Sequence, residues 1–367
     1  MSGRWTLPPL APGDLTPDFC APSRLNPKYN FSTVAGRYVL LAFMPNDPAR
    51  RAGAVAAFAA IRPRFDDRFL AAFFVASRAD GPDIPADQTP GQRWLFDPDG
   101  DVARLYHLRD DEGGWFLLDP TQRLLQIAPL DAPGPLFARI VAGLPPLAAH
   151  AGTPLVAPAL VVPRVFEPEF CRRLIDVYEA RGGAPSGVMR DIDGRTVGVL
   201  DGMKRRRDVN LEQDPELRRE IVARIERSVI PMIARTYQFR PTRIERYLVA
   251  CYDAAEGGFF RPHRDNETLG TAHRRFACSI NLNSEEFEGG DLRFPEFGPR
   301  TYRPPTGGAV VFACNLLHEA TAVTRGRRYA FLPFFYDEEG HRIREANSAF
   351  MAPDPAEAAP VQASEGG

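Results

Sequence analysis

The residues best suited to chemistry in this chain are two histidines and one aspartate, His263, Asp265 and His318. Two imidazoles and one carboxylate form the ligand set of a non-haem Fe(II) site that leaves coordination positions open. Arg328 follows His318 by ten residues, and its planar, permanently charged guanidinium is suited to binding a carboxylate. These four side chains predict a metal centre with an anion-binding group beside it.

The spacing of these residues suggests how they could meet. In an extended strand, residues two apart point to the same face, so His263 and Asp265 can reach one metal ion. His318 then comes from a different strand, and ten residues suffice for a turn and a returning strand with Arg328. The same alternation puts Arg328 and Leu332 on one face. An inward Arg328 implies an anionic partner, because burying an unpaired charge is costly.

The stretches around these residues carry a resemblance to a known family. They are residues 252–265 (YDAAEGGFFRPHRD), 288–294 (EGGDLRF) and 305–331 (PTGGAVVFACNLLHEATAVTRGRRYAF). This part of the chain resembles the double-stranded β-helix (jelly roll) of the iron- and 2-oxoglutarate-dependent oxygenases, close to the prolyl-4-hydroxylase branch. The resemblance runs from about residue 160 to about residue 337, roughly half of the chain.

The resemblance implies a role for each matching residue. His263, Asp265 and His318 would bind Fe(II), and Arg328 would pair with the far carboxylate of 2-oxoglutarate. Tyr252 matches a tyrosine that often lines the cosubstrate pocket. Family members that halogenate replace the carboxylate ligand by a small residue, so an intact Asp265 favours hydroxylation. Ascorbate is a further expected cofactor, as the reductant.

Asn281 is a further candidate for the cosubstrate pocket. It shares one face of a strand expected at residues 277–283 with Asn283. The two side chains could hydrogen-bond in the pocket or face water.

Composition sets the class of protein. The chain has 367 residues, 44% hydrophobic and 25% charged, which predicts a globular protein of two domains. A net charge of -2 gives no electrostatic case for nucleic acid or an anionic membrane as partner. No apolar signal core or membrane-spanning run is present, and five scattered cysteines do not form a disulfide framework. A reducing cytoplasm is expected, and no feature indicates an oligomeric state.

A first domain is expected over residues 1–145. Continuous apolar runs at 38–44 and 69–76 predict buried parallel strands, separated by an alanine-rich helix at 52–61. Short strands and a closing helix follow, at 94–97, 115–119, 124–127 and 136–144. Strand–helix–strand followed by a hairpin and a helix is the order of an α/β thioredoxin-like fold.

Three stretches of this domain, LAPGDLTPDF, FDPDGDVARLYHL and FLLDPTQRLLQI, resemble the peroxiredoxin branch of that fold. The chain departs from that branch where the reactive cysteine should stand. Ala49 aligns with its threonine and Ala52 with its cysteine, so the thiolate that peroxidase chemistry needs is missing. Cys20 could be a displaced reactive thiol, but a small buried apolar residue is the favoured interpretation. The domain is expected to have lost peroxidase activity, and it could dock a protein partner.

Residues 146–159, rich in proline and alanine, are expected to be a linker, 160–345 the oxygenase domain and 346–367 a disordered tail. Two helices, from about 166 to 181 and from 214 to 237, should buttress the sheet, with Asp214 as N-cap and Pro215 next. The basic run KRRRD at 204–208 predicts a solvated loop, or else a mobile entrance lip that meets an acidic substrate.

The sequence thus predicts an Fe(II)- and 2-oxoglutarate-dependent hydroxylase. Its substrate could be a peptidyl or amino-acid-like side chain, or a small metabolite, with succinate and CO2 released. The alternative is a regulatory or interaction protein whose iron site only senses and whose first domain docks a partner. The missing cysteine nearly excludes a thiol peroxidase.

Overall fold

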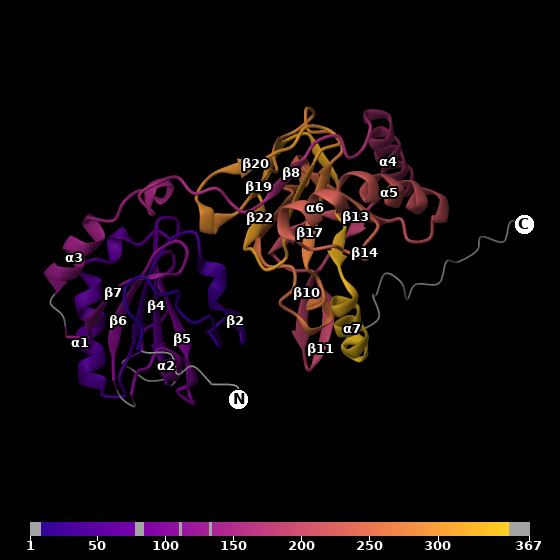
Figure 1. Cartoon of the computed structure of the whole chain (residues 1–367). Helices are drawn as coiled ribbons and strands as arrows, with labels where there is room; N and C mark the ends of the chain where they lie inside the picture. Colours follow the sequence, from indigo (N-terminus) through magenta and orange to yellow (C-terminus); the bar gives the residue numbers. More distant parts are fainter. Residues whose placement is uncertain (1–8, 78–83, 110–111, 132–133, 352–367) are drawn as a thin grey trace, which may run out of the picture. The chain divides into compact units, whose positions relative to one another are not determined.

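The computed structural model describes residues 9–77, 84–109, 112–131 and 134–351 (Figure 1). It divides into two compact units, Met1–Ala157 with Phe294–Arg300, and Pro158–Arg293 with Thr301–Gly367. None of its described helices is long and apolar enough to span a membrane.

The first unit is built on a five-stranded sheet in the order β5-β4-β3-β6-β7. The strands are β3 (Tyr38–Phe43), β4 (Leu70–Ala76), β5 (Gln92–Phe96), β6 (Gly114–Leu118) and β7 (Leu124–Pro129). The first three are mutually parallel, and the last two run antiparallel to their neighbours. This is the predicted order of strand, helix, strand and then a hairpin.

Both faces of this sheet are buried, which explains the continuous apolar runs. Leu40 belongs to the core on one side, together with Phe58 of α1 (Pro48–Ala59) and Val141 of α3 (Gly134–Ala142). Leu41 belongs to the core on the other, with Val102 of α2 (Asp101–Leu105). Alternate residues of one strand therefore need apolar side chains in both directions.

Two expectations for the first unit were wrong. Helix α1 begins at Pro48 instead of residue 52, because Asp47 caps it by accepting hydrogen bonds from the backbone amides of Ala49 and Arg50. Cys20 was expected to be buried, but it is exposed in β1 (Cys20–Ala21), which pairs with β2 (Tyr29–Asn30).

The second unit contains a nine-stranded and a five-stranded sheet. The strands of the larger sheet are β8 (Leu160–Val162), β9 (Ala184–Pro185), β13 (Arg207–Asn210), β14 (Arg243–Glu245), β15 (Leu248–Asp253), β17 (Phe276–Asn281), β21 (Ala309–Ala313), β24 (Arg327–Phe331) and β25 (Phe334–Tyr336). Those of the smaller sheet are β12 (Lys204–Arg205), β16 (Phe259–His263), β19 (Leu292–Arg293), β20 (Thr301–Tyr302) and β22 (His318–Ala320).

The described part of the chain also contains two further two-stranded ribbons and seven 3-10 turns. The ribbons pair β10 (Val188–Ile192) with β11 (Arg195–Val199), and β18 (Glu288–Gly289) with β23 (Val323–Arg325). The 3-10 turns are Phe31–Val34, Arg62–Arg64, Leu147–Ala149, Ala254–Glu256, Leu269–Thr271, Pro295–Phe297 and Ser348–Phe350.

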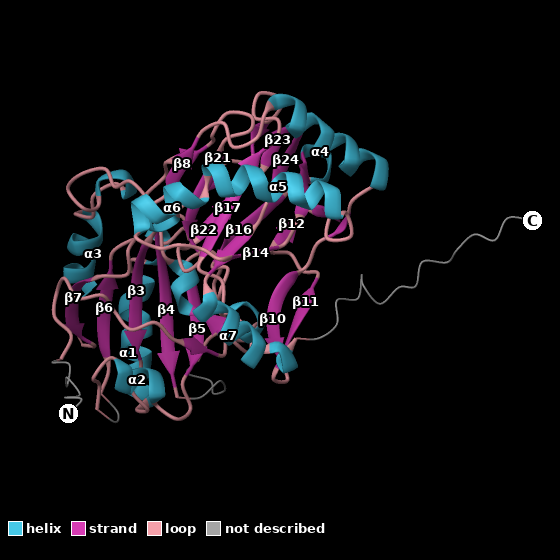
Figure 2. Cartoon of the chain, turned by 45° about the vertical axis from the view of Figure 1, so that its right-hand side comes forward, coloured by secondary structure: helices cyan, strands magenta, loops and turns pink. Residues whose placement is uncertain are grey.

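Helices α4 (Pro168–Arg181), α5 (Pro215–Ser228) and α6 (Ile230–Tyr237) cover one face of the larger sheet, as predicted (Figure 2). In β15, Val249 and Cys251 face these helices, whereas Leu248, Ala250 and Tyr252 face the other way. This second face looks into the pocket that contains the candidate site. A last helix, α7 (Glu338–Ala346), follows the larger sheet's final strand.

The predicted helix at 214–237 is two helices. Asp214 caps α5 as predicted, by accepting from the amide of Leu217, but α5 ends at Ser228 and α6 begins at Ile230. Pro231 is the physical reason, because its ring nitrogen has no hydrogen to continue the helical ladder.

The basic run 204–208 is not the predicted solvated loop or lip. It forms β12 and the start of β13, with Lys204 and Arg206 buried. In the expected tail, Ser348–Phe350 forms a 3-10 turn, and residues 352–367 lie outside the described residues.

Gly307 provides a test of this fold. Its φ is +76°, and a Cβ there would lie 2.0 Å from the carbonyl oxygen of Phe166. Gly307→Ala should lower the free energy of unfolding by roughly 2 kcal/mol or more, because a strained backbone and a backbone clash add. Gly182 also has a positive φ, +66°, but no atom lies within 4 Å of an added Cβ. Gly182→Ala should cost about 1 kcal/mol. Urea unfolding compares the two, and equal losses would contradict the clash.

Candidate metal centre

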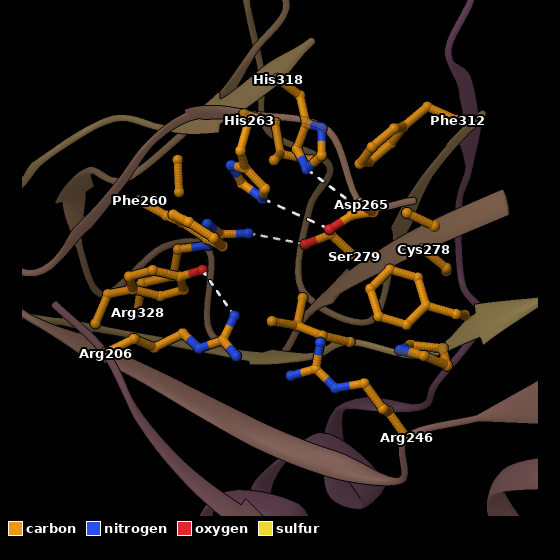
Figure 3. Close-up of a pocket in the computed structure, with 17 residues that line it drawn as sticks. Arg206, Arg246, Phe260, His263, Asp265, Cys278, Ser279, Phe312, His318 and Arg328 are labelled. Atoms are coloured by element: carbon orange, nitrogen blue, oxygen red, sulfur yellow. Dashed lines mark hydrogen bonds and ion pairs between the residues drawn. The ribbon is translucent and has the colours of Figure 1, made fainter. Parts of the chain in front are cut away.

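Neighbouring strands bring the two histidines together. His263 ends β16 and His318 begins β22, and the two residues are register partners in this antiparallel pair. Asp265 joins them, so that donor atoms of the three residues all lie within 4.8 Å of one another. The structure thus gathers the three residues that the sequence analysis selected (Figure 3).

The distances fit one shared metal ion. Nε2 of His263 lies 3.5 Å from Oδ1 of Asp265, and Nε2 of His318 lies 3.3 Å from Oδ2. Two ligands at right angles, each about 2.1 Å from a metal, would be about 3 Å apart. Two imidazole nitrogens and a carboxylate on one side of an ion suit Fe(II), which would keep positions for other ligands.

The backbone fixes the tautomer of both rings. Nδ1 of His263 lies 2.8 Å from the carbonyl oxygen of Arg261, and Nδ1 of His318 lies 3.0 Å from that of Leu316. A carbonyl can only accept, so each Nδ1 must carry the proton and donate it. Each Nε2 is then left with a lone pair for a metal.

Asp265 reaches the site for a reason other than the one predicted. Strand β16 ends at His263, so Asp265 lies in a bend beyond the strand and the two-residue alternation does not apply. Its backbone amide donates to the carbonyl oxygen of Cys314, 2.9 Å away. This bond ties the bend to the segment before His318 and turns the carboxylate toward both rings.

Burial and charge give the ligands suitable protonation states. Burial alone would raise the pKa of Asp265, but His318 and His263 more than offset it and hold that pKa below its usual range. Burial lowers the pKa of His318 to about 4, against the opposing effect of Asp265. Near neutral pH the carboxylate is ionised and His318 is neutral, as metal ligation requires.

Arg328 lines the same pocket as the three candidate ligand residues. Its side chain is buried and donates to Oγ of Ser279 at 2.8 Å and to Oδ1 of Asn281 at 3.2 Å. Nη1 is buried and has no hydrogen-bond partner among the described residues. Burial also lowers the pKa of Arg328, because Tyr252 and Asp291 offset the effect of burial only in part. A carboxylate in the pocket would supply what this guanidinium lacks.

Comparison with known proteins agrees with this geometry. Residues 247–336 match the sequence model of the 2OG-Fe(II) oxygenase superfamily, a range that holds all three ligand residues and Arg328. This segment is a 2OG-Fe(II) oxygenase domain.

Curated relatives of the oxygenase domain carry hydroxylase names. A PKHD-type hydroxylase of Pseudomonas fluorescens is 29% identical over 191 residues, 49% of this chain and 77% of the relative. A PKHD-type hydroxylase of Synechococcus is 28% identical over 124 residues, 32% of this chain and 53% of the relative. The chain thus spans about half the length of the first curated relatives it matches.

A solved prolyl hydroxylase of Trichoplax adhaerens aligns with a TM-score of 0.41 and 16% identity. That alignment covers 50% of this chain and 86% of that one.

Tyr252 and Asn281, the two further candidates, differ in position. Tyr252 lines the pocket of the oxygenase domain, and its ring lies 5.2 Å from the guanidinium carbon of Arg328. Asn281 is buried behind Arg328 and does not line the pocket. It therefore faces neither water nor the cavity, and it holds Arg328 in place. Asn283 is also buried, and its side-chain oxygen accepts from the amide of Tyr329 at 2.9 Å.

Sequence reasoning missed three polar features of this pocket. Ser279 precedes Asn281 by two residues on β17, a spacing that could have paired both with Arg328. Arg206 and Arg246 line the pocket and offered no such signal, since β12 and β14 are two and three residues long.

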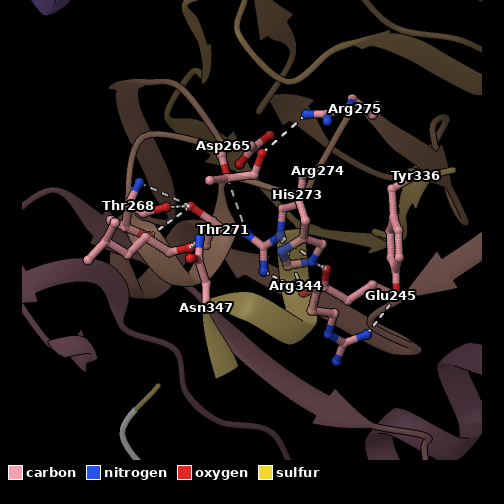
Figure 4. Close-up of polar contacts among 12 residues, drawn as sticks. Glu245, Asp265, Thr268, Thr271, His273, Arg274, Arg275, Tyr336, Arg344 and Asn347 are labelled. Carbon is pink, nitrogen blue, oxygen red and sulfur yellow. Dashed lines mark hydrogen bonds and ion pairs between the residues drawn. The ribbon is translucent and has the colours of Figure 1, made fainter. Parts of the chain in front are cut away.

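The third missed feature is a buried ion cluster behind Asp265 (Figure 4). Arg274 donates to Oε1 of Glu245 at 2.6 Å and to the carbonyl oxygen of Asp265 at 3.4 Å. Nε2 of His273 lies 2.5 Å from Oε2 of Glu245. Glu245 thus holds the arginine that supports the backbone of a ligand residue.

Glu245→Gln tests this cluster. Burial raises the pKa of Glu245, but Arg274 and His273 lower that pKa by a larger amount, so the net shift is downward. A depressed pKa contributes stability that is present above the unfolded carboxyl value of about 4.3 and is lost as pH falls through the folded value. At pH 7 the variant should lose about 3 kcal/mol of unfolding free energy, because Arg274 keeps a buried charge without its partner.

The matched control is Glu338→Gln, which removes the exposed partner of Arg243 and should cost under about 1 kcal/mol. Urea unfolding at pH 7 and at pH 3 measures the free energy of unfolding of both variants and of the wild type. The difference between wild type and Glu245→Gln should shrink at the lower pH. A loss no larger than the control's would contradict the supporting role of Glu245.

Proposed function

We propose that the protein is an Fe(II)- and 2-oxoglutarate-dependent dioxygenase that hydroxylates its substrate and releases succinate and CO2. The observation that carries this proposal is one pocket with two complementary parts. Three ligand side chains converge at one side of it, and a buried arginine with an unpaired nitrogen enters it from β24. The match of residues 247–336 to the oxygenase superfamily supports the same assignment.

Each residue of the pocket has a defined task in this proposal. His263, Asp265 and His318 would hold Fe(II), and Arg328 would hold the far carboxylate of 2-oxoglutarate. When bound, the iron and 2-oxoglutarate together supply the oxidation of an unactivated C–H bond. The protein supplies orientation, charge balance and a pocket from which water is excluded.

Aromatic side chains surround the two histidines and leave little room for water on that side of the pocket. The ring of Phe260 stacks on that of His263 with centroids 3.4 Å apart, and the ring of Phe312 lies 4.5 Å from that of His318. Leu292 and Ala320 complete this apolar lining. Such walls confine a reactive oxidant to the bound substrate and strengthen the electrostatic contacts inside.

The substrate proposed is a peptidyl or free amino-acid-like side chain. The hydroxylase names of the curated relatives support hydroxylation, and so does Asp265, whose carboxylate occupies the position that a halide would need. Ascorbate is proposed as the reductant that keeps the iron ferrous, and the cytoplasm as the compartment. The proposed domains are 1–145, peroxiredoxin-like without its cysteine, and 160–345.

A second candidate is an iron-binding regulatory protein. It is favoured by the first unit, where Ala52 stands exposed on α1 at the position of the missing thiol, which leaves docking of a protein partner as a use for that unit. Stoichiometry separates the candidates. A dioxygenase releases one succinate for each oxidised product, whereas a sensor binds 2-oxoglutarate without coupled turnover.

His318→Ala and His263→Ala test the metal ligands. Anaerobic addition of Fe(II) and 2-oxoglutarate to wild type should produce a visible charge-transfer band, and both variants should lose it. The affinity of each variant for Fe(II) should fall by more than the roughly 10–100-fold that is lost when a residue hydrogen-bonded to a metal ligand is removed. His341→Ala is the control, since His341 pairs with Glu345 on α7 away from the pocket, and it should keep the band. A band retained in His318→Ala would refute the assignment.

Arg328→Ala tests the carboxylate-binding group. The apparent affinity for 2-oxoglutarate should fall about 10–100-fold, because a charge-assisted hydrogen bond to its far carboxylate is lost. The dependence of the band and of succinate release on 2-oxoglutarate concentration measures it. Arg327→Ala, the exposed neighbour bound to Glu179 and Asp253, should leave that affinity unchanged. Unchanged affinity in Arg328→Ala would show that 2-oxoglutarate is held elsewhere.

A further inference from the structure

Two arginines in the pocket have no task in the proposed mechanism. Arg206 and Arg246 both line it, and their guanidinium groups point toward each other on the side away from His318 in Figure 3. Arg206 follows β12 and Arg246 follows β14, so they come from distant parts of the chain. A pocket that buries this much positive charge needs negative charge to balance it.

Arg206 is already balanced by the protein. Its Nη2 donates to Oδ2 of Asp208 at 2.6 Å and to Oγ of Ser186 at 3.2 Å, and its Nη1 donates to the hydroxyl of Tyr252 at 3.4 Å. Asp208 is mostly buried and lies beside it on β13. This carboxylate therefore serves Arg206.

Arg246 has no carboxylate of its own. Its nearest one is Oδ2 of Asp208 at 3.8 Å, the oxygen that Arg206 already binds. It donates no side-chain hydrogen bond to any described residue, and its guanidinium carbon lies 5.2 Å from the ring of Phe334. Glu245, its chain neighbour, is engaged by Arg274 and His273.

The backbone of Arg246 is strained. Its φ is +67°, in the left-handed region that non-glycine residues seldom adopt. A conformation of this kind costs about 1–3 kcal/mol and persists where the surroundings or a function demand it.

Arg246 is also separate from the position assigned to 2-oxoglutarate. Arg328 pairs with Tyr252 near the end of β15, whereas Arg246 precedes the start of that strand, six residues before Tyr252. The two guanidinium groups thus enter the pocket from opposite ends of one strand. In the proposed function, Arg328 would hold one carboxylate of 2-oxoglutarate and the iron site would take the other, so neither would be left for Arg246.

The charge balance points the same way. Asp291 and Arg303, which also act on Arg328, form an ion pair whose charges cancel. Besides this pair, four arginines at or behind the pocket face three carboxylates among the described residues. They are Arg206, Arg246, Arg274 and Arg328, and Asp208, Glu245 and Asp265. A ferrous ion adds two positive charges and 2-oxoglutarate adds two negative ones, so one positive charge stays uncompensated. Lys204 is left out of this count; a charged Lys204, whose Nζ donates to Oγ of Ser186 at 2.9 Å, would only add to the excess of positive charge.

The pKa of Arg246 also reflects this excess of positive charge. Burial, followed by the charges of Arg206 and Arg274, lowers its pKa to about 10, and Asp208 and Glu245 offset this only in part. Bringing an anion to the guanidinium would remove that penalty.

We propose that the substrate of this enzyme carries a carboxylate, and that Arg246 binds it at the end of β15 opposite the 2-oxoglutarate position. The proposal rests on the proposed function and deepens it by naming a substrate class. The carboxylate can be the α-carboxylate of a free amino acid or the side chain of an acidic residue. Both present the same planar anion to a guanidinium.

Matched pairs of probes test the carboxylate. The wild-type protein is loaded anaerobically with Fe(II) and 2-oxoglutarate, and the visible band is followed as each probe is added. One pair is L-proline and L-prolinamide, and the other is N-acetyl-L-glutamate amide and N-acetyl-L-glutamine amide. At least one acid should shift the band, and its amide should bind at least about 10-fold more weakly. The pair that responds identifies the source of the carboxylate.

Arg246→Gln then assigns the binding residue. It should weaken the acid about 10–100-fold, to the level of the amide, and leave the affinity for 2-oxoglutarate within about 3-fold of wild type. Arg243→Gln removes the same charge from the surface end of β14 and should change neither affinity. The inference is overturned if acid and amide bind alike, if no acid shifts the band, or if Arg246→Gln loses 2-oxoglutarate instead. Absence of the band in wild type would overturn the proposed function itself.

A second measurement does not depend on the choice of probe. In the ligand-free protein, Arg246→Gln should leave the thermal unfolding midpoint unchanged or raise it, because a partly buried cation that shares its one nearby carboxylate with Arg206 is removed. Arg206→Gln should lower the midpoint, because Asp208 loses its partner. If the thermal unfolding midpoint falls as far in Arg246→Gln as in Arg206→Gln, Arg246 is a structural partner of Asp208 and the proposal is overturned.

Discussion

The antiparallel pairing of β16 with β22 is the constraint on which the metal centre depends. It sets His263 and His318 directly across from each other, at the separation at which cross-strand side chains meet. The amide of Asp265, bound to the carbonyl oxygen of Cys314, then fixes the bend after β16. Three donors from two segments, more than fifty residues apart in the chain, therefore meet because two strands and one loop are joined by backbone hydrogen bonds.

Charge is distributed around this centre in an ordered way. Asp265 is held between two imidazoles, Asp208 serves Arg206, and Glu245 serves Arg274 and His273. Each of these three carboxylates is thus already engaged by groups of the protein. The arginines that remain, Arg328 and Arg246, face the cavity without a carboxylate of their own. In the proposed function, these two arginines are the groups that would bind small anions, because the folded chain already presents their positive charges to the cavity.

Much of this could be predicted from the sequence, because the residue types limit the chemistry. Two histidines, an aspartate and a later arginine indicated the site, and the apolar runs of β3 and β4 indicated a sheet buried on both faces. The two-residue alternation predicted that Asp265 would lie beside His263. The two residues do lie together, but the alternation is not the cause, since β16 ends at His263. A local sequence pattern cannot show that the chain bends after His263, because the bend is held by a hydrogen bond from the amide of Asp265 to the carbonyl oxygen of Cys314, far along the chain.

The other misses have similar physical causes. Pro231 was visible, and its missing amide hydrogen accounts for the break between α5 and α6. Lys204 and Arg206 looked solvated because strands of two to four residues are too short to display a period. Exposure of Cys20 depends on how β1 and β2 pack, which no local signal reports.

The rings of the two histidines are oriented by backbone carbonyl groups two residues before each ring, at Arg261 in β16 and at Leu316 in the bend before β22. Their orientation is therefore a property of the main chain and depends little on neighbouring side chains. The walls of the pocket can change through substitution without redirecting the donor atoms. A lineage that keeps this backbone can exchange one substrate for another in small steps, while the metal-binding geometry is inherited unchanged.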